Sequence, residues 1–172
     1  LNAELFNTER HDEVAAAIVD FLNKHPYSKP VIAGYSMGGN FTLRIAADFG
    51  PQLGLKHAIA VCPPTDPANS MRAISSGSVI YREYFYRKWR KSLVKKLDHW
   101  PELDYADVLA TARSLEDLNA YFIPRFTRFK RVEDYFAAYS ITGDSLANLA
   151  LPPHLIATED DPVIPIADLS AI

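Results

Sequence analysis

The fold is decided by the stretch Val31-Ile32-Ala33-Gly34-Tyr35-Ser36-Met37-Gly38-Gly39-Asn40. A short β-branched run ends in a Gly-x-Ser-x-Gly pattern, and residues 41–49, which suit a helix, follow at once. This order predicts a strand, a very tight turn and a helix, with Ser36 at the apex of the turn. In such a nucleophile elbow the serine backbone is strained and its hydroxyl projects above the sheet.

The residues around Ser36 fit the demands of so sharp a turn. We expect Gly34 and Gly38 to remove Cβ atoms that would crowd each other across it. Gly39 would let the helix pack closely against the strand. The backbone N–H of Met37, at the helix start, would point to the place where negative charge develops on a substrate oxygen. The pattern therefore predicts Ser36 as a nucleophile and Met37 as an oxyanion donor.

The stretch allows two other interpretations. In one, it is a glycine-rich turn whose serine only caps the helix. In the other it binds phosphate, which fits less well because no Gly-Lys-Ser/Thr follows and the Gly-x-Gly-x-x-Gly spacing is absent. The strand start after Lys29-Pro30 and an acidic turn downstream favour the elbow.

Length and composition indicate one globular domain. The chain has 172 residues, of which 48% are hydrophobic, and a net charge of −3, which argues against disorder and against a general nucleic-acid-binding charge. The single cysteine, Cys62, excludes an internal disulfide and fits a reducing compartment, although it also suits a small apolar position at a strand end. No apolar run approaches 18 residues and no signal-peptide pattern is present, so we expect a cytoplasmic protein.

The chain alternates between helical and strand patterns around the elbow. A helix is expected from Thr8 to Lys24, followed by buried parallel strands over 30–35, 55–62 and 152–158. The strand–helix–strand order over 30–62 indicates a right-handed crossover, which makes the sheet parallel.

The region between the second and third strands has a different character. From about 65 to 149 helical segments dominate, which predicts a helical cap inserted at 67–150 into a core made of 1–66 and 151–172. We expect a helix with a stripe of apolar and aromatic side chains, a helix start at Ser114 and a further short helix over 132–139. The stripe is formed by Val79, Tyr86, Trp89, Leu93 and Leu97.

Residues 82–96 carry seven Lys or Arg against one acid, Glu83. Aromatic residues are interleaved with these charges. One interpretation is a surface that touches lipid or an anionic partner. The other, which we favour, is a solvated helix face whose aromatic side chains pack onto the core.

An acidic turn follows the third expected strand: Glu159-Asp160-Asp161-Pro162. A carboxylate just after a buried strand is well placed to orient a histidine and to stabilise the imidazolium that forms during proton transfer. The alternative is a solvated acidic turn, but the order of serine before acid favours the functional interpretation.

Five segments occur in an order found in a known family: 34–40, 62–66, 81–96, 133–136 and 159–162. Together they resemble the YheT-like α/β-hydrolases, predicted carboxylesterases related to the mammalian abhydrolase-domain lipases. The resemblance implies that Ser36 is the nucleophile, that the Met37 N–H is one oxyanion donor, and that Asp161, as the fourth residue of its turn, is the triad acid. Family members usually have a His-Gly pair where this chain has Thr127-Arg128, so their substrate preference is not transferred.

The resemblance also implies parts that the printed sequence lacks: strands before the elbow, and a final strand with a glycine-flanked histidine after the acid. All five histidines precede Asp161: His11, His25, His57, His99 and His154. We interpret the first two as solvated and His57 and His154 as structural. His99, in the cap, is the only one that could swing over the pocket. We therefore expect a catalytic histidine beyond Ile172, a longer natural polypeptide, and no activity from these 172 residues alone.

The sequence thus predicts an α/β fold, part of an α/β-hydrolase parallel sheet with an inserted helical cap. The expected reaction is hydrolysis of a small carboxylic ester through an acyl-enzyme, without metal, organic cofactor or nucleic acid. Lipid contact through the cap, and the oligomeric state, stay open. The alternatives are a thioesterase, acyltransferase or amidase on the same triad, or a non-catalytic hydrolase-like binding protein.

Overall fold

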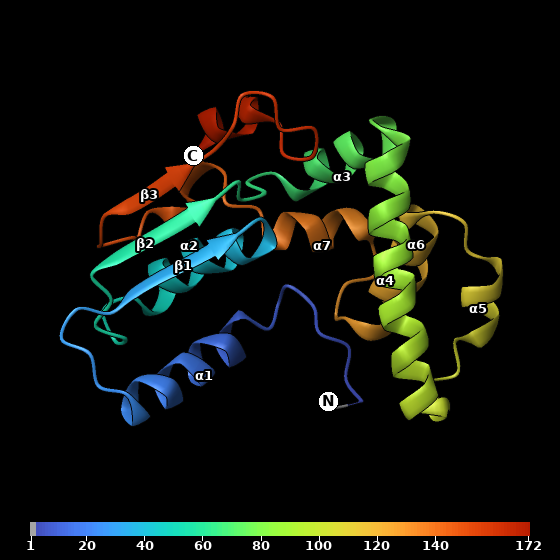
Figure 1. Ribbon diagram of the computed structural model, residues 1–172, viewed down its shortest axis with the longest axis horizontal. Helices are drawn as coiled ribbons and strands as arrows, with labels where there is room; N and C mark the ends of the chain where they lie inside the picture. Colours follow the sequence, from blue (N-terminus) through green and yellow to red (C-terminus); the bar gives the residue numbers. More distant parts are fainter. Residues whose placement is uncertain (1–2) are drawn as a thin grey trace.

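A computed structural model describes residues 3–172, and its centre is a three-stranded sheet (Figure 1). The strands are β1 (Val31–Tyr35), β2 (His57–Val61) and β3 (Pro153–Ile156), in the order β1-β2-β3. Both pairings are parallel, which confirms the prediction from the crossover. The expected positions of all three strands are correct, but each strand is shorter than its apolar run, because pairing ends before the flanking turns.

The register brings the elbow beside the middle of the sheet, with Gly34 opposite Ala60 and Ala60 opposite Leu155. The remaining regular structure is helical. Its helices are α1 (His11–Lys24), α2 (Met37–Phe49), α3 (Pro67–Ser76), α4 (Val79–His99), α5 (Ala106–Thr111), α6 (Leu115–Phe126) and α7 (Val132–Ala138), with 3₁₀ turns η1 (Pro101–Leu103), η2 (Gly143–Leu146) and η3 (Ile166–Ala171).

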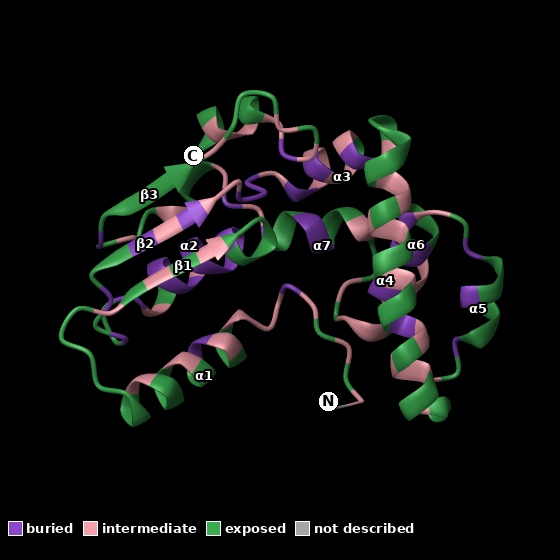
Figure 2. Cartoon of the chain, viewed as in Figure 1, coloured by how far each residue is buried: buried purple, intermediate pink, exposed green. Residues whose placement is uncertain are grey.

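One face of the sheet is covered by α2, and α1 packs against α2 in turn. Small residues of the sheet allow this close layer: Ala58 and Ala60 are fully buried. Phe41 and Ile45 of α2 join Ala58 in the same apolar cluster. Figure 2 shows the buried residues concentrated in α2 and β2, so this interface is the core of the sheet layer.

The other face of the sheet is open within residues 3–172, and here the expectation of buried strands was wrong. β1 was predicted to be apolar on both sides and covered by helices, yet Val31 is 49% exposed and Tyr35 is 76% exposed. β3 is exposed along its whole length. The reason is the missing cover: among residues 3–172 the helix packed on β1 and β2 is α2, which lies on the opposite face of the sheet.

Helices α3 to α7 and the turn η2, residues 67–146, lie between β2 and β3 in the chain; we call this segment the helical layer. It has its own core, in which the Tyr105 hydroxyl donates to the Leu93 carbonyl oxygen at 3.0 Å. The predicted stripe of α4 does pack there from Tyr86 onward. Val79 is 58% exposed and does not belong to it, because it is the first residue of α4 and precedes the part that packs.

The helix ends follow from local hydrogen bonds. The predicted start at Ser114 is confirmed: its hydroxyl accepts from the Asp117 N–H at 3.1 Å, and the Asp117 carboxylate accepts from the Ser114 N–H at 3.1 Å. The predicted start at Thr8 was wrong. Thr8 is buried and holds the chain before α1 in place, donating to the Tyr135 hydroxyl and accepting from Arg44. The first helical residue is His11.

Candidate active site

Ser36 occupies the strained turn that the sequence predicted. Its φ is +50° and its ψ is −123°, a conformation that non-glycine residues rarely adopt. Both sides of the peptide unit are fixed: its N–H donates to the Val61 carbonyl at 2.8 Å, and its carbonyl accepts from Gly39 at 2.8 Å and Asn40 at 3.2 Å. These hydrogen bonds to the sheet and to α2 therefore keep Ser36 in its strained conformation. The hydroxyl is exposed, and no described residue hydrogen-bonds to it.

The three glycines do different work. A Cβ added to Gly34 would lie 2.2 Å from the Gly38 carbonyl oxygen, so only glycine fits there. A Cβ on Gly39 would lie 3.2 Å from the Pro63 Cβ, which supports the predicted close packing. A Cβ on Gly38 would meet nothing within 4 Å. The expectation that Gly38 must lack a side chain was therefore wrong: its backbone, not its missing Cβ, closes the turn against Gly34.

Asn40 is a positioning residue that the sequence interpretation missed. It is fully buried in the first turns of α2, and its amide donates to the Pro64 carbonyl at 3.0 Å and the Tyr139 carbonyl at 2.9 Å. These bonds tie the elbow helix to the segment after β2 and to the end of α7. The sequence could have indicated this role, because Asn40 is an amide in an otherwise apolar, tightly packed helix start.

The acidic turn and Ser36 lie at the same end of the sheet, since each follows the carboxyl end of a parallel strand. Asp161 is partly buried and accepts from the backbone N–H groups of Val163 at 2.8 Å and Ile164 at 3.0 Å. Asp160 is exposed. The Asp161 carboxylate is therefore oriented by its own turn, whereas Asp160 faces solvent.

Cys62 adds a feature that the sequence did not reveal. It follows β2 with a φ of +45°, beside the acidic turn. Burial raises the pKa of the Cys62 thiol, and the neighbouring Asp161 carboxylate raises it further. A raised pKa disfavours the thiolate, so Cys62 is a poor nucleophile.

A cavity of about 250 Å³ opens beside Ser36 and Met37. The sheet edge provides one side of it, and α3, α4, α6 and the end of α7 provide the other. Its lining is mostly apolar and includes Pro64, Pro67, Ser70, Met71, Ile74, Phe85, Trp89, Leu115, Tyr139, Val163 and Ile164. Such a lining suits an uncharged, largely apolar substrate group next to a reactive serine.

Two histidines lie at the far end of the sheet. His57 Nδ1 and His154 Nε2 are 3.1 Å apart, at the starts of β2 and β3. His99 is placed on α4, where its Nδ1 lies 2.8 Å from the Lys95 carbonyl and its ring contacts Trp100. None of the three hydrogen-bonds to Ser36. This agrees with the structural roles predicted for His57 and His154, and His99 does not act as a partner of Ser36 from the helical layer.

The two N-terminal histidines differ from each other. His25 is exposed against Phe21, as predicted for a solvated residue. His11 is not solvated: its side chain is 22% exposed, and its Nε2 lies 2.9 Å from an Asp48 carboxylate oxygen. Arg44 lies 3.1 Å from its other ring nitrogen. The interpretation of His11 as a surface residue was wrong, because α1 packs this side chain against α2.

The basic helix α4 turns part of its charge inward. Arg90 donates to the Leu109 carbonyl at 3.0 Å, and Arg82 donates to the Ser75 carbonyl at 3.0 Å. Tyr86 and Trp89 pack onto the helical core, as in the favoured interpretation. Ile80 and Tyr84, however, are 78% and 52% exposed, so the outward face retains apolar side chains. Lipid contact through this face therefore stays a prediction.

Two further properties bear on the chemistry. Among residues 3–172, no group of three or more His, Cys, Asp or Glu side chains is arranged to hold a metal ion. Nor does any helix in that range combine the length and apolar character needed to cross a membrane.

Comparison with known proteins adds one finding to this geometry. Residues 4–172 match a family model described as "Alpha/beta hydrolase family". No curated protein and no solved structure matches the chain. The match spans the sheet, the elbow and the helical layer.

Proposed function

The chain belongs to the alpha/beta hydrolase family, and on that premise we propose that it cleaves carboxylic esters through an acyl-enzyme on Ser36. One observation carries the proposal. Ser36 has a positive φ at the carboxyl end of β1 and, together with Met37 at the start of α2, lines an apolar cavity of about 250 Å³. Within the family, hydrolysis is the expected activity; the ester substrate is the proposed part.

In the proposed reaction the Ser36 hydroxyl oxygen attacks the ester carbonyl carbon while its proton passes to a histidine. The carbonyl oxygen becomes an oxyanion next to the start of α2, where the Met37 N–H lacks an acceptor within its helix. The tetrahedral intermediate collapses with cleavage of the C–O bond, and the histidine returns its proton to the leaving alcohol. Water then hydrolyses the acyl-enzyme by the same steps.

Asp161 is the proposed acid that orients this histidine. Its turn bonds fix one carboxylate oxygen, which leaves the second oxygen for the imidazole N–H. The five described histidines have other partners or lie away from Ser36. We therefore propose that the base comes from outside the 172 residues, and that these residues alone lack turnover.

The ester, rather than a charged substrate, is favoured by the walls of the cavity. Beyond Ser36, Met37 and Ser70 they present proline, methionine, leucine, isoleucine, valine and aromatic side chains. Among residues 3–172, no Lys, Arg, Asp or Glu lines the cavity. An uncharged acyl or alcohol group loses least on entering such a site.

The test compares the natural polypeptide with its Ser36→Ala variant on short p-nitrophenyl esters. We expect kcat to fall by about 10⁴-fold or more, because the variant has no oxygen to acylate. Ser70→Ala is the matched control: Ser70 lines the same cavity, but its hydroxyl donates to the Asp66 carbonyl at 3.1 Å. An unchanged rate for Ser36→Ala would contradict the proposal.

The same assay separates the alternatives. Thioesters, amides and an added alcohol acceptor would identify a thioesterase, an amidase or an acyltransferase on the same serine. A non-catalytic binding protein would turn over none of these substrates and would bind esters equally well with or without the Ser36 hydroxyl.

A further inference from the structure

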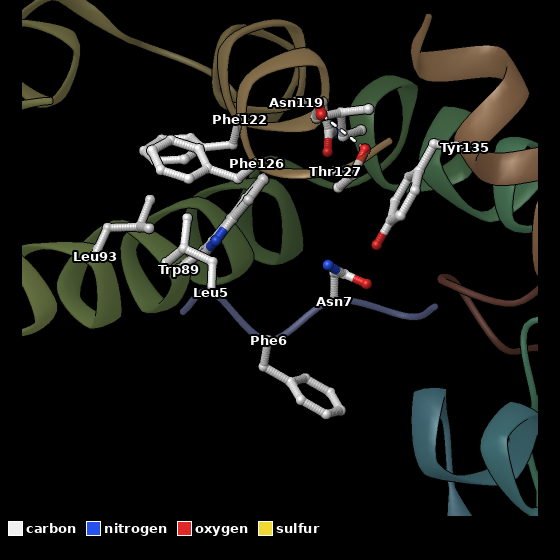
Figure 3. A pocket seen from close by; sticks show the side chains of 11 residues that line it. Leu5, Phe6, Asn7, Trp89, Leu93, Asn119, Phe122, Phe126, Thr127 and Tyr135 are labelled. Carbon is white, nitrogen blue, oxygen red and sulfur yellow. Dashed lines mark hydrogen bonds between the residues drawn. The ribbon is translucent and has the colours of Figure 1, made fainter. Parts of the chain in front are cut away.

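A second, smaller cavity lies behind the Ser36 cavity. It measures about 90 Å³ and lies between the N-terminal segment 5–7 and helices α4, α6 and α7 (Figure 3). Its volume is that of roughly three water molecules or of three similarly sized chain groups.

The two cavities share a wall that is one side chain thick. Trp89 lines both of them. Beside it, Met71 lines the Ser36 cavity and Asn119 lines the second one, with the Asn119 amide nitrogen 3.9 Å from the Met71 sulfur. Removing the indole would therefore join the second cavity to the first.

The second cavity has one apolar and one polar side. In the view of Figure 3, Leu93, Trp89 and Phe122 lie opposite Asn119 and Tyr135. The Trp89 and Phe122 rings are 6.1 Å apart, and Phe122 is buried. This apolar side provides dispersion contacts for an alkyl group.

The polar side has unused hydrogen-bonding capacity. Asn119 is 6% exposed, yet no described residue donates to its side-chain oxygen. The Tyr135 hydroxyl accepts from the Thr8 N–H at 3.1 Å, and no described residue accepts its proton. A hydroxyl group can pair with either of them, since it donates to an amide oxygen and accepts from a phenol.

We propose that the second cavity receives the far end of the substrate chain, an alkyl group with a terminal hydroxyl, and that Trp89 controls its passage from the Ser36 cavity. This inference rests on the proposed function, because the chain is attached to the carbonyl that Ser36 attacks. It makes Trp89 a determinant of chain length and Asn119 a determinant of the chain's terminal group.

The first experiment measures kcat/KM for a series of p-nitrophenyl esters of increasing chain length with the natural polypeptide. In Trp89→Ala we expect the best chain to lengthen by about three carbons, with kcat/KM for those longer esters raised about tenfold. The acetyl ester serves as the reference substrate for each variant. Trp100→Ala, which removes the other tryptophan, is the matched control and should leave the profile unchanged. If kcat/KM depended on chain length in Trp89→Ala as it does in the parent protein, the inference would be overturned.

The second experiment compares esters of equal length that end in a hydroxyl or in a methyl group. With Trp89→Ala the hydroxyl-terminated ester should be favoured about fivefold to tenfold, and adding Asn119→Leu should remove that preference. Thermal melting verifies that the variants fold. A preference that survives Asn119→Leu would contradict the role of Asn119.

A binding measurement separates this inference from the proposed function. In a Ser36→Ala, Trp100→Phe protein the sole tryptophan is Trp89, and 10-bromodecanoic acid should quench its fluorescence saturably. Saturable quenching, combined with no esterase activity in the parent protein, would support chain binding in the second cavity and would contradict ester hydrolysis as the function. If esterase activity is lost in Ser36→Ala but quenching is not saturable, ester hydrolysis on Ser36 is supported and the inference about the second cavity is overturned.

Discussion

The elbow and the helical layer form opposite sides of one cavity, but they are specified in different ways. Residues 34–39 are consecutive, and their geometry follows from steric contacts between near neighbours such as Gly34 and Gly38. The helical layer builds its wall from Trp89, Leu115 and Tyr139, which belong to three separate parts of the chain. The reactive group is thus encoded locally, whereas the shape of its pocket depends on long-range packing. Changes at the elbow should therefore affect all substrates alike, and changes in the helical layer should discriminate between them.

The largest effect that sharpens this contrast is expected at the acidic turn. In the natural polypeptide Asp161→Asn should lower kcat by about 10⁴-fold for every ester tested, because the histidine loses the carboxylate that orients it. Asp160→Asn is the neighbouring control and should change kcat little, since Asp160 is exposed. Steady-state kinetics across the ester series measures both. A larger loss of kcat in Asp160→Asn than in Asp161→Asn would show that Asp160, not Asp161, is the triad acid.

The next effect concerns the stability of the elbow itself. Gly34→Ala should destabilise the fold by about 3 kcal/mol or more, since its Cβ would overlap the Gly38 carbonyl. Gly38→Ala should be neutral or stabilise by up to about 1 kcal/mol, because the site is open and alanine favours a helix. Thermal or urea unfolding compares the two. Equal losses at both glycines would show that the turn is not closed by this contact.

A smaller effect is expected where the two regions meet. Asn40→Ala should cost about 2 kcal/mol, because it leaves the buried carbonyls of Pro64 and Tyr139 without their donor. Asn69→Ala, which removes a partly buried amide at α3, should cost less. If urea unfolding gave Asn40→Ala no larger loss than the control, Asn40 would not be the link between elbow and helical layer.

The smallest effect lies wholly inside the helical layer. Ser114→Ala removes one half of a reciprocal cap and should cost about 1 kcal/mol. Ser78→Ala, at a cap with a single 3.3 Å bond, should cost a few tenths of a kcal/mol. Urea unfolding would detect the difference. The elbow, and with it the acetyl ester rate, should be unaffected by either change; a fall in that rate would mean that the two regions are less separate than we infer.

The sequence predicted what short-range rules determine. The Ser36 turn, the parallel pairing and the Ser114 cap all depend on residues within a few positions or on chain order. It could not predict that β1 is an exposed edge, because the Val31–Tyr35 run looks the same at an edge and at the centre of a sheet. It also missed the buried contacts of Asn40 and His11, since their partners are far away in the chain.

The most direct test of the central assignment is covalent labelling of the natural polypeptide with a fluorophosphonate, which reacts quickly only with an activated serine. The adduct is located by mass spectrometry of the peptides. We predict a single fast-reacting site at Ser36, lost in Ser36→Ala and retained in Ser70→Ala. A fast adduct on another serine, or none at Ser36, would contradict the account.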